Sequence, residues 1–197
     1  FIPVARISDL PLKPGEEYDF DGERRVYPDT RLVYWCGGNP FHHHQDLNRL
    51  ADAFRRPESV IVHEPFWTAT ARHADIVLPA TTTLERNDIG AGKRDNLWSA
   101  MHQAIPPVHQ SWNDHDIFAG LADRLDIGEA FTEGKSEMDW LREMYETAAK
   151  GAADRGVELP EFDQFWAEGG VELPHPKEPH ILLGKFRNDP EGAKLRT

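Results

Sequence analysis

The chain has 197 residues, of which 39% are hydrophobic and 28% charged, with a formal net charge of −12 at pH 7. This length allows one domain with a buried core, or one domain with a small appendage. The negative charge argues against a nucleic-acid partner, because phosphate backbones require clustered Lys and Arg. No apolar run approaches the ~20 residues that span a bilayer, so no membrane segment is expected. The single cysteine, Cys36, excludes an internal disulfide, and we interpret it as a buried strand residue.

Residues 1–30 are predicted to form an N-terminal hairpin and connecting segment. The run from Tyr18 to Tyr27 is typical of two short strands joined at Asp21-Gly22, a favoured pair for a tight turn. The chain starts at Phe1 without an initiating Met and stops at Thr197 on a polar stretch. Both ends are therefore expected to be cut from a longer protein.

Residues 31–130 are predicted to form an α/β domain. Apolar strands alternate with helical periodicity, and the expected order is strand 31–36, helix 45–56, strand 59–63, short helix 68–74 and strand 75–80. The near-continuous apolar character of the first strand predicts burial on both faces. This order indicates half of an open, largely parallel, doubly wound (Rossmann-like) sheet with flanking helices. Ligands of such sheets bind beyond the carboxyl ends of the strands.

Residues 131–197 are predicted to form a helical and loop C-terminal extension. Before it, residues 84–112 are predicted to be a long irregular excursion, and Asn113 and Asp114 offer caps for a helix to about residue 125. Ser136 and Asp139 have the spacing of a capping box for a further helix. The apolar face of that helix is predicted to contain Trp140, Leu141, Met144, Tyr145 and Ala148. A short helix is expected at 160–168.

Two features at the predicted strand ends indicate a phosphorylated ligand. Gly37-Gly38-Asn39-Pro40 follows the first strand directly, and glycine removes the Cβ atoms that would hold the backbone away from phosphate. Glu64 follows the second strand, where a carboxylate accepts hydrogen bonds from ribose or from the N1–H and N2–H₂ edge of guanine. Without other information, Glu64 is more typical of an exposed loop acid, and Asn39 is also typical of a simple turn residue.

Other polar residues permit two interpretations each. Arg86 follows the third strand and is suited to clamping a pyrophosphate, although a salt bridge with Glu85 or Asp88 is the ordinary alternative. Asp116 lies near a helix start, where an acid also stabilises the helix dipole. The run His42-His-His44 places consecutive side chains about 100° apart on a helix, so they cannot converge on one metal ion. We therefore predict neither a metal site nor a catalytic residue in this chain.

Two long motifs resemble the molybdopterin oxidoreductases of the dimethyl sulfoxide reductase family. They are Trp35-Cys-Gly-Gly-Asn-Pro-Phe-His-His-His-Gln-Asp-Leu-Asn-Arg-Leu50 and the segment from Val62 to Asp88, which contains Ala74-Asp-Ile-Val-Leu-Pro-Ala80. The likeness is strongest to the branch of biotin sulfoxide, trimethylamine N-oxide and dimethyl sulfoxide reductases. It extends over nearly the whole chain, because segments beginning at Ile2, Phe131 and Phe162 resemble the same branch in the same order.

The resemblance implies a bis(molybdopterin guanine dinucleotide) molybdenum cofactor, with residues 31–130 gripping one guanine dinucleotide. It places Gly38, Asn39 and His43 near the pterin–pyrophosphate portion. It also places Glu64 and Thr68 at the guanosine, and Arg86 and Asp116 on the same dinucleotide. The implied function is oxygen-atom transfer from a small S-oxide or N-oxide, supported by the remaining domains of the polypeptide and an electron-donor protein.

The resemblance also sets limits on what this chain does by itself. Family members are several-fold longer, and both the molybdenum ligand and a C-terminal barrel are expected outside the chain. The isolated chain is therefore expected to lack the cofactor and to be inactive, and cytoplasmic and periplasmic locations are not distinguished. Residues 92–96 depart from the branch pattern, so no contact is assigned to them. The alternatives are a non-catalytic scaffold homologue that docks partners and a free-standing nucleotide-binding domain.

Overall fold

The structure is a computed structural model that describes residues 2–92 and 95–174. The chain divides into two compact units, each described here by itself. Unit 1 comprises Phe1–Thr82 and Pro107–Phe118, and unit 2 comprises Thr83–Pro106 and Ala119–Thr197. No helix in the described part of the chain is long and apolar enough to cross a membrane.

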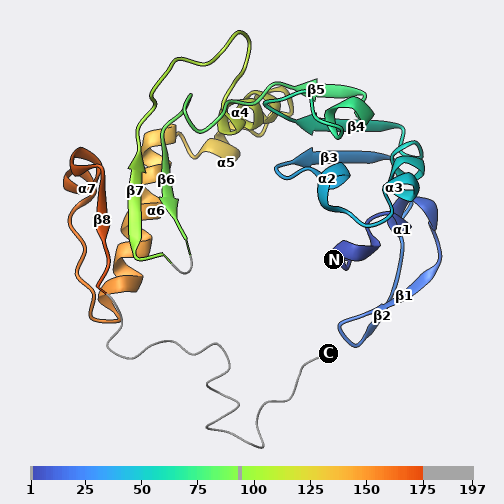
Figure 1. Cartoon of the computed structure of the whole chain (residues 1–197), viewed down its shortest axis with the longest axis horizontal. Helices are drawn as coiled ribbons and strands as arrows, with labels where there is room; N and C mark the ends of the chain where they lie inside the picture. Colours follow the sequence, from blue (N-terminus) through green and yellow to red (C-terminus); the bar gives the residue numbers. More distant parts are fainter. Residues whose placement is uncertain (1, 93–94, 175–197) are drawn as a thin grey trace, which may run out of the picture. The chain divides into compact units, whose positions relative to one another are not determined.

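Unit 1 contains mostly short elements around a parallel sheet (Figure 1). Its described elements are the 3₁₀ helices η1 (Val4–Arg6) and η2 (Ala71–His73), helices α1 (Asp9–Leu12), α2 (Pro40–His43) and α3 (Leu47–Phe54), strands β1 (Glu17–Phe20), β2 (Glu23–Val26), β3 (Leu32–Cys36), β4 (Ser59–His63) and β5 (Ile76–Leu78), and the start of α4 (Asp114–Arg124).

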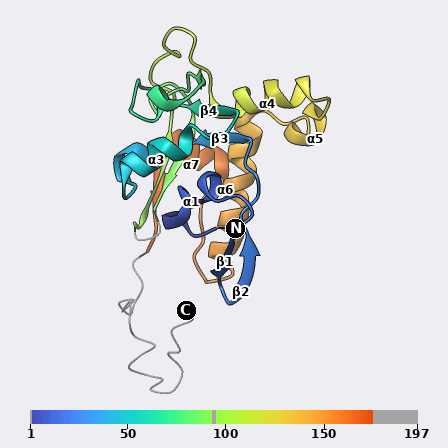
Figure 2. The ribbon, with the colours of Figure 1, turned by 90° about the vertical axis from the view of Figure 1, so that its right-hand side faces the viewer.

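The sheet of unit 1 has three parallel strands in the order β3-β4-β5, which confirms the predicted parallel strands. The strand ends are in register, with Cys36 opposite His63 and His63 opposite Leu78. Helix α3 covers one face (Figure 2), where Leu50 and Phe54 pack in one cluster with Val60 and Val62 of β4. The amphipathic helix predicted at 45–56 therefore forms the core of this unit.

The predicted burial of the first strand on both faces is wrong. β3 is an edge strand in the order β3-β4-β5, and Leu32 remains 52% exposed. Cys36, expected to be buried, is likewise exposed at the end of this strand. An apolar run cannot reveal by itself which strand lies in the middle of a sheet, since edge and central strands draw on the same residues.

The predicted N-terminal hairpin is confirmed. β1 and β2 pair antiparallel, with Phe20 opposite Glu23 across the turn. Both turn residues have left-handed backbone, with φ of 53° at Asp21 and 78° at Gly22, as a two-residue hairpin turn requires.

Unit 2 combines an antiparallel sheet with helices. Its described elements are β6 (Asp88–Ala91), β7 (Leu97–Met101), the remainder of α4, α5 (Gly128–Thr132), α6 (Glu137–Ala153), α7 (Phe162–Glu168) and β8 (Gly170–Glu172). The strand order is β6-β7-β8, and a cluster that includes Ala100, Leu141, Tyr145, Phe162 and Phe165 forms the core.

The irregular excursion predicted at 84–112 instead contains the β6–β7 hairpin. Gly90 lies opposite Ser99 in the sheet. A Cβ atom built on Gly90 would approach Met101 Sδ to 3.1 Å, so the glycine allows close cross-strand packing.

Sequence reading also missed α5 and β8. In β8, a Cβ on Gly170 would lie 2.5 Å from the carbonyl oxygen of Trp98.

The predicted capping box at the start of α6 is confirmed. Ser136 Oγ accepts from the backbone N–H of Asp139, and Asp139 Oδ2 accepts from the backbone N–H of Ser136 at 2.9 Å. Leu141 and Tyr145 are buried as predicted, whereas Met144 is 54% exposed and does not belong to the buried face. The short helix expected at 160–168 is present as α7.

Candidate functional site

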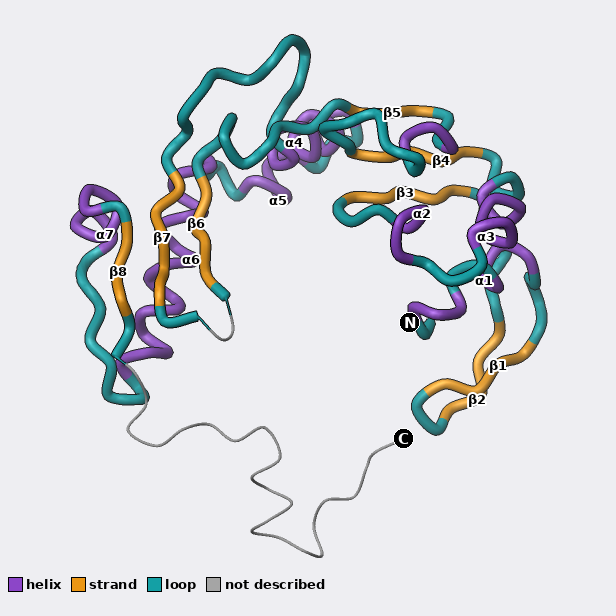
Figure 3. The backbone as a smooth tube through the Cα atoms, in the orientation of Figure 1, coloured by secondary structure: helices purple, strands orange, loops and turns teal. Residues whose placement is uncertain are grey.

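The carboxyl edge of the parallel sheet brings two of the predicted ligand-binding segments together. Because Cys36 pairs with His63 in register, Gly37 and Glu64 leave the sheet from the same edge. β5 ends at the same edge, and the backbone N–H of Glu64 donates to the carbonyl of Leu78 at 3.2 Å. The loops that follow these strands (teal in Figure 3) therefore form one candidate binding edge.

The glycine turn after β3 has the backbone that a close-approaching ligand requires. Gly37 and Gly38 have φ of 77° and 70°, a region that disfavours residues with a Cβ atom. A Cβ on Gly37 would meet no atom within 4 Å, so the space beside this turn is open. The indole N–H of Trp35 donates to the carbonyl of Gly37 at 2.9 Å and holds the turn.

Asn39 connects this turn to the segment after β4. The hydroxyl of Thr70, which is fully buried, donates to Asn39 Oδ1, and the backbone N–H of Phe41 contacts the same hydroxyl at 3.5 Å. Within the part of the chain that the structure describes, Asn39 Nδ2 makes no hydrogen bond and remains available as a donor. Asn39 is therefore more than a turn residue, because its side chain orients the loop.

Glu64 is held by Thr68 in a short turn. Thr68 Oγ1 donates to Glu64 Oε2 at 3.0 Å, and the backbone N–H of Thr68 donates to the carbonyl of Phe66 at 2.8 Å. Both Glu64 and Thr68 are half-buried, whereas Phe66 and Trp67 between them are 67% and 65% exposed. Glu64 Oε1 has no hydrogen bond to any described residue, so the carboxylate retains an acceptor for a ligand.

His43 and Asp116 lie in other parts of unit 1. His43 is exposed at the end of α2, and its Cε1 lies 3.8 Å from the position that a Cβ on Gly38 would occupy. Asp116 is exposed in the first turn of α4, and its Oδ1 lies 3.4 Å from His115 Nδ1. The structure thus places His43 beside the glycine turn, and Asp116 on the helix whose first residue contacts β4.

Arg86 belongs to unit 2. Its Nε and Nη2 donate to Asp88 Oδ2 at 3.2 and 3.0 Å. This is the ordinary salt bridge that the sequence offered as the alternative to a pyrophosphate clamp.

Sequence reading missed a hydrogen-bonded chain beneath the candidate edge. The Tyr34 hydroxyl lies 2.7 Å from His63 Nε2, and His63 Nδ1 lies 2.7 Å from Asp114 Oδ1. The His63 side chain is 1% exposed. Strand alternation was the signal that could have indicated this chain, because Tyr34 and His63 face away from the side that α3 covers.

Two groups near this chain have perturbed acidity. Burial raises the pKa of the Tyr34 phenol above its ordinary value, with smaller effects from the negative charges of Cys36 and Asp114. Desolvation, followed by the charge of Asp114, also raises the pKa of the Cys36 thiol. A thiol with a raised pKa is a poor nucleophile at neutral pH, so exposure alone does not make Cys36 a catalytic residue.

The histidine run does not form a metal centre. His44 Nε2 donates to the carbonyl of Val4 at 3.0 Å, and His73 stacks on Phe41 with ring centroids 3.9 Å apart. Among residues 2–92 and 95–174, no group of three or more His, Cys, Asp or Glu side chains is arranged to hold a metal ion.

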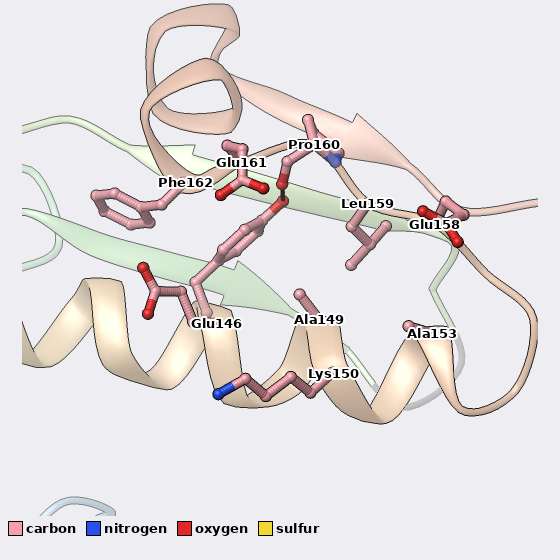
Figure 4. A pocket seen from close by; sticks show the side chains of 10 residues that line it. Glu146, Ala149, Lys150, Ala153, Glu158, Leu159, Pro160, Glu161 and Phe162 are labelled. Atoms are coloured by element: carbon pink, nitrogen blue, oxygen red, sulfur yellow. Dashed lines mark hydrogen bonds between the residues drawn. The ribbon is translucent and has the colours of Figure 1, made fainter.

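Unit 2 contains a separate pocket of about 430 Å³ between α6 and the segment that leads into α7 (Figure 4). Its charged lining residues are Lys150 and three glutamates, Glu146, Glu158 and Glu161. The Tyr145 hydroxyl donates to the carbonyl of Pro160 at 2.7 Å and is not available to a ligand. None of the predicted ligand-binding residues lines this pocket.

Comparison with known proteins identifies the family. The model of the molybdopterin oxidoreductases matches residues 9–124. The chain belongs to the molybdopterin oxidoreductase family. It is 52% identical to a biotin sulfoxide reductase of Cereibacter sphaeroides over 198 residues, covering 100% of this chain and 26% of that relative. It is 50% identical to a dimethyl sulfoxide/trimethylamine N-oxide reductase of Rhodobacter capsulatus, covering 96% of this chain and 23% of the relative.

These matches confirm the family and the branch that the two motifs resemble. The chain spans about a quarter of the length of these curated relatives. Among solved structures, an acetylene hydratase from Pelobacter acetylenicus superposes with a TM-score of 0.58 at 18% identity, over 87% of this chain and 21% of that one. At this identity, the likeness shows a shared fold and nothing about substrate.

Proposed function

We propose that this chain is part of a molybdenum-dependent S-oxide or N-oxide reductase and that the carboxyl edge of unit 1 binds one guanine dinucleotide of a bis(molybdopterin guanine dinucleotide) cofactor. The observation that carries the proposal is the Glu64 carboxylate, held by Thr68 at the same sheet edge as two left-handed glycines. The named relatives reduce sulfoxides or trimethylamine N-oxide, which favours a reductase over a non-catalytic scaffold.

The glycine turn fits a pyrophosphate group. Positive φ at Gly37 and Gly38, with open space beside Gly37, permits backbone N–H groups to approach phosphate oxygens without an intervening Cβ. Asn39 Nδ2 adds a neutral donor, and His43 next to Gly38 adds an imidazole. In a chain with a formal charge of −12, such local donors are the means by which an anionic ligand is held.

Glu64 and Thr68 fit a guanosine. An ionised carboxylate only accepts hydrogen bonds, and the N1–H and N2–H₂ edge of guanine only donates them. Thr68 holds one carboxylate oxygen and leaves Oε1 for the ligand. In the proposal Asp116 and Arg86 contact the same dinucleotide.

The chemistry that the molybdenum cofactor supplies when bound is two-electron oxygen-atom transfer. The residues of this chain bind and orient the cofactor. In this account the substrate funnel, the metal ligand and the electron-donor contact belong to the remainder of the polypeptide, and this chain alone is inactive. We also propose that the parallel sheet belongs to a doubly wound, Rossmann-like arrangement. Its support is that α3 contacts one face, while Phe118 of α4 contacts Tyr34 and His63 on the other.

The test is Glu64→Gln in the full-length protein, with Glu161→Gln as the matched control. Glu161 is an exposed acid in unit 2 whose side chain makes no cap to α7. Guanine nucleotide released over time after dilution is quantified by chromatography, together with molybdenum content. Losing a charged hydrogen bond is expected to speed release by about 10- to 100-fold in the Glu64 variant and not in the control. Equal release from the wild-type protein and both variants contradicts the proposal.

A further inference from the structure

We propose that Tyr34, His63 and Asp114 form a positioning chain that fixes the geometry of the dinucleotide site. The inference rests on the proposed function and adds to it three residues that are not among the proposed ligand contacts. The three come from the middle of β3, the last position of β4 and the first position of α4. Two hydrogen bonds of 2.7 Å connect them.

The direction of each hydrogen bond follows from the chemistry of its partners. An ionised Asp114 carboxylate only accepts, so His63 Nδ1 carries the proton and donates. His63 Nε2 then accepts from the Tyr34 hydroxyl. Burial raises the pKa of Tyr34, which keeps this hydroxyl protonated and able to donate. With a neutral imidazole the chain has one consistent arrangement of protons, and His63 has a partner at both ring nitrogens.

Phe118 packs on the same chain and restricts its geometry further. Its ring centroid lies 4.9 Å from that of His63 and 5.8 Å from that of Tyr34. Phe118 lies one turn along α4 from Asp114. The same turn of α4 therefore supplies the carboxylate that bonds to His63 and the ring that packs against it. This double contact fixes the start of α4 against the ends of β3 and β4.

Each member of the chain is a near neighbour in sequence of a proposed ligand contact. His63 directly precedes Glu64, Asp114 lies two residues before Asp116, and Tyr34 lies four residues before Gly38. A displacement of any member therefore moves a backbone segment that carries a ligand contact. Small displacements matter at such sites, because hydrogen bonds weaken steeply with distance and angle.

Stability alone does not require polar residues at these positions. Apolar side chains would pack against Phe118 without needing hydrogen-bond partners, and such replacements of buried polar groups are often neutral or stabilising. A hydrogen-bonded chain centred on the buried His63 imidazole, by contrast, selects one arrangement of its segments, because a misaligned alternative leaves a buried ring nitrogen without a partner. Selection of one geometry is what a cofactor-binding edge requires.

The experiment compares Tyr34→Phe with Tyr145→Phe in the full-length holoprotein. Each substitution removes one tyrosine hydroxyl that makes a 2.7 Å hydrogen bond, in unit 1 for Tyr34 and in unit 2 for Tyr145. Both retain the aromatic ring, so the packing of Tyr34 on Phe118 persists and folding is preserved. We expect Tyr34→Phe to release guanine nucleotide about tenfold faster than Tyr145→Phe, with similar thermal unfolding temperatures.

A second pair tests the other end of the chain. Asp114→Asn retains an oxygen that accepts from His63 Nδ1, whereas Asp114→Ala removes it. Release is expected to be close to wild type in the Asn variant and about tenfold faster in the Ala variant, so the conservative change rescues the function.

Inclusion of Glu64→Gln separates this inference from the proposed function. Faster release from Glu64→Gln, combined with equal release from Tyr34→Phe and Tyr145→Phe, overturns the positioning chain and leaves the proposed function standing. Wild-type release from Glu64→Gln overturns the proposed function and the positioning chain with it.

Discussion

Unit 1 and unit 2 differ in where they bury polar side chains. Among the described residues, the buried polar or charged residues are Ser8, His63, Thr70 and Thr81 in unit 1 and Glu85 in unit 2. Stacked aromatic rings are buried in both units, with Tyr18 and Tyr27 4.2 Å apart in unit 1 and Tyr145 and Phe165 4.4 Å apart in unit 2. Burying a polar group is costly unless it is hydrogen-bonded. The greater number of buried polar residues in unit 1 fits the proposed binding edge there, whereas nothing comparable is proposed for unit 2.

The largest expected effect is on stability, from Phe165→Ala in unit 2. Phe165 is fully buried, and truncation of a core phenylalanine costs about 3–5 kcal/mol of unfolding free energy. Chemical denaturation of the full-length protein measures the loss. Guanine nucleotide release from the protein that remains folded should match the wild type. Rapid release from folded Phe165→Ala protein would break the distinction between the two units.

A smaller effect is expected from alanine at two left-handed glycines. Gly38 in unit 1 has φ of 70° and Gly169 in unit 2 has φ of 82°. At both positions a Cβ meets no atom closer than 3.8 Å, so the cost is backbone strain of about 1 kcal/mol in each. Thermal unfolding should therefore shift equally, whereas nucleotide release should accelerate only in Gly38→Ala. Equal release from both variants would contradict the assignment of the glycine turn to the ligand.

The cap of α6 provides a similar test restricted to unit 2. Ser136→Ala removes the hydroxyl that accepts from the backbone N–H of Asp139 and is expected to cost about 1 kcal/mol. Denaturant titration measures this loss, and nucleotide release is expected to be unchanged. A change in release would show that the stability of unit 2 and ligand retention are coupled.

The smallest expected effect concerns acid pH. Hydrogen bonds from the Ser136 hydroxyl and backbone lower the pKa of Asp139 below its ordinary value of 3.8. The resulting stabilisation is present above pH 3.8 and is lost as pH falls through the lowered pKa of the folded state. Asp139→Asn should therefore make stability less dependent on pH below about 4 than in the wild type. Identical pH profiles in denaturant titrations would contradict a role for this carboxylate.

Local signals in the sequence were sufficient for several elements. The turn at Asp21-Gly22 and the capping box at Ser136 and Asp139 predicted structure correctly, because each depends on residues within a few positions. The parallel strands also followed from short apolar runs bounded by turn residues. The glycine turn and Glu64 could be located because they directly follow those strands.

Features that depend on distant contacts could not be predicted. His63 bonds to Tyr34 and Asp114, which lie 29 and 51 residues away in sequence, so no local pattern connects them. Gly90 lies in a stretch predicted to be irregular, and its place in a strand depends on pairing with Ser99 of β7. The exposure of Cys36 likewise depends on β3 being an edge strand, which an apolar run does not indicate.

An experimental structure of the full-length protein with its cofactor tests the central claim most directly. The account predicts that the Glu64 carboxylate lies about 2.7–3.2 Å from N1 and N2 of one guanine. It also predicts that Gly37 and Gly38 lie against the pyrophosphate of the same dinucleotide. A structure in which both guanine dinucleotides bind elsewhere, with the Glu64 carboxylate still bonded only to Thr68, would contradict it.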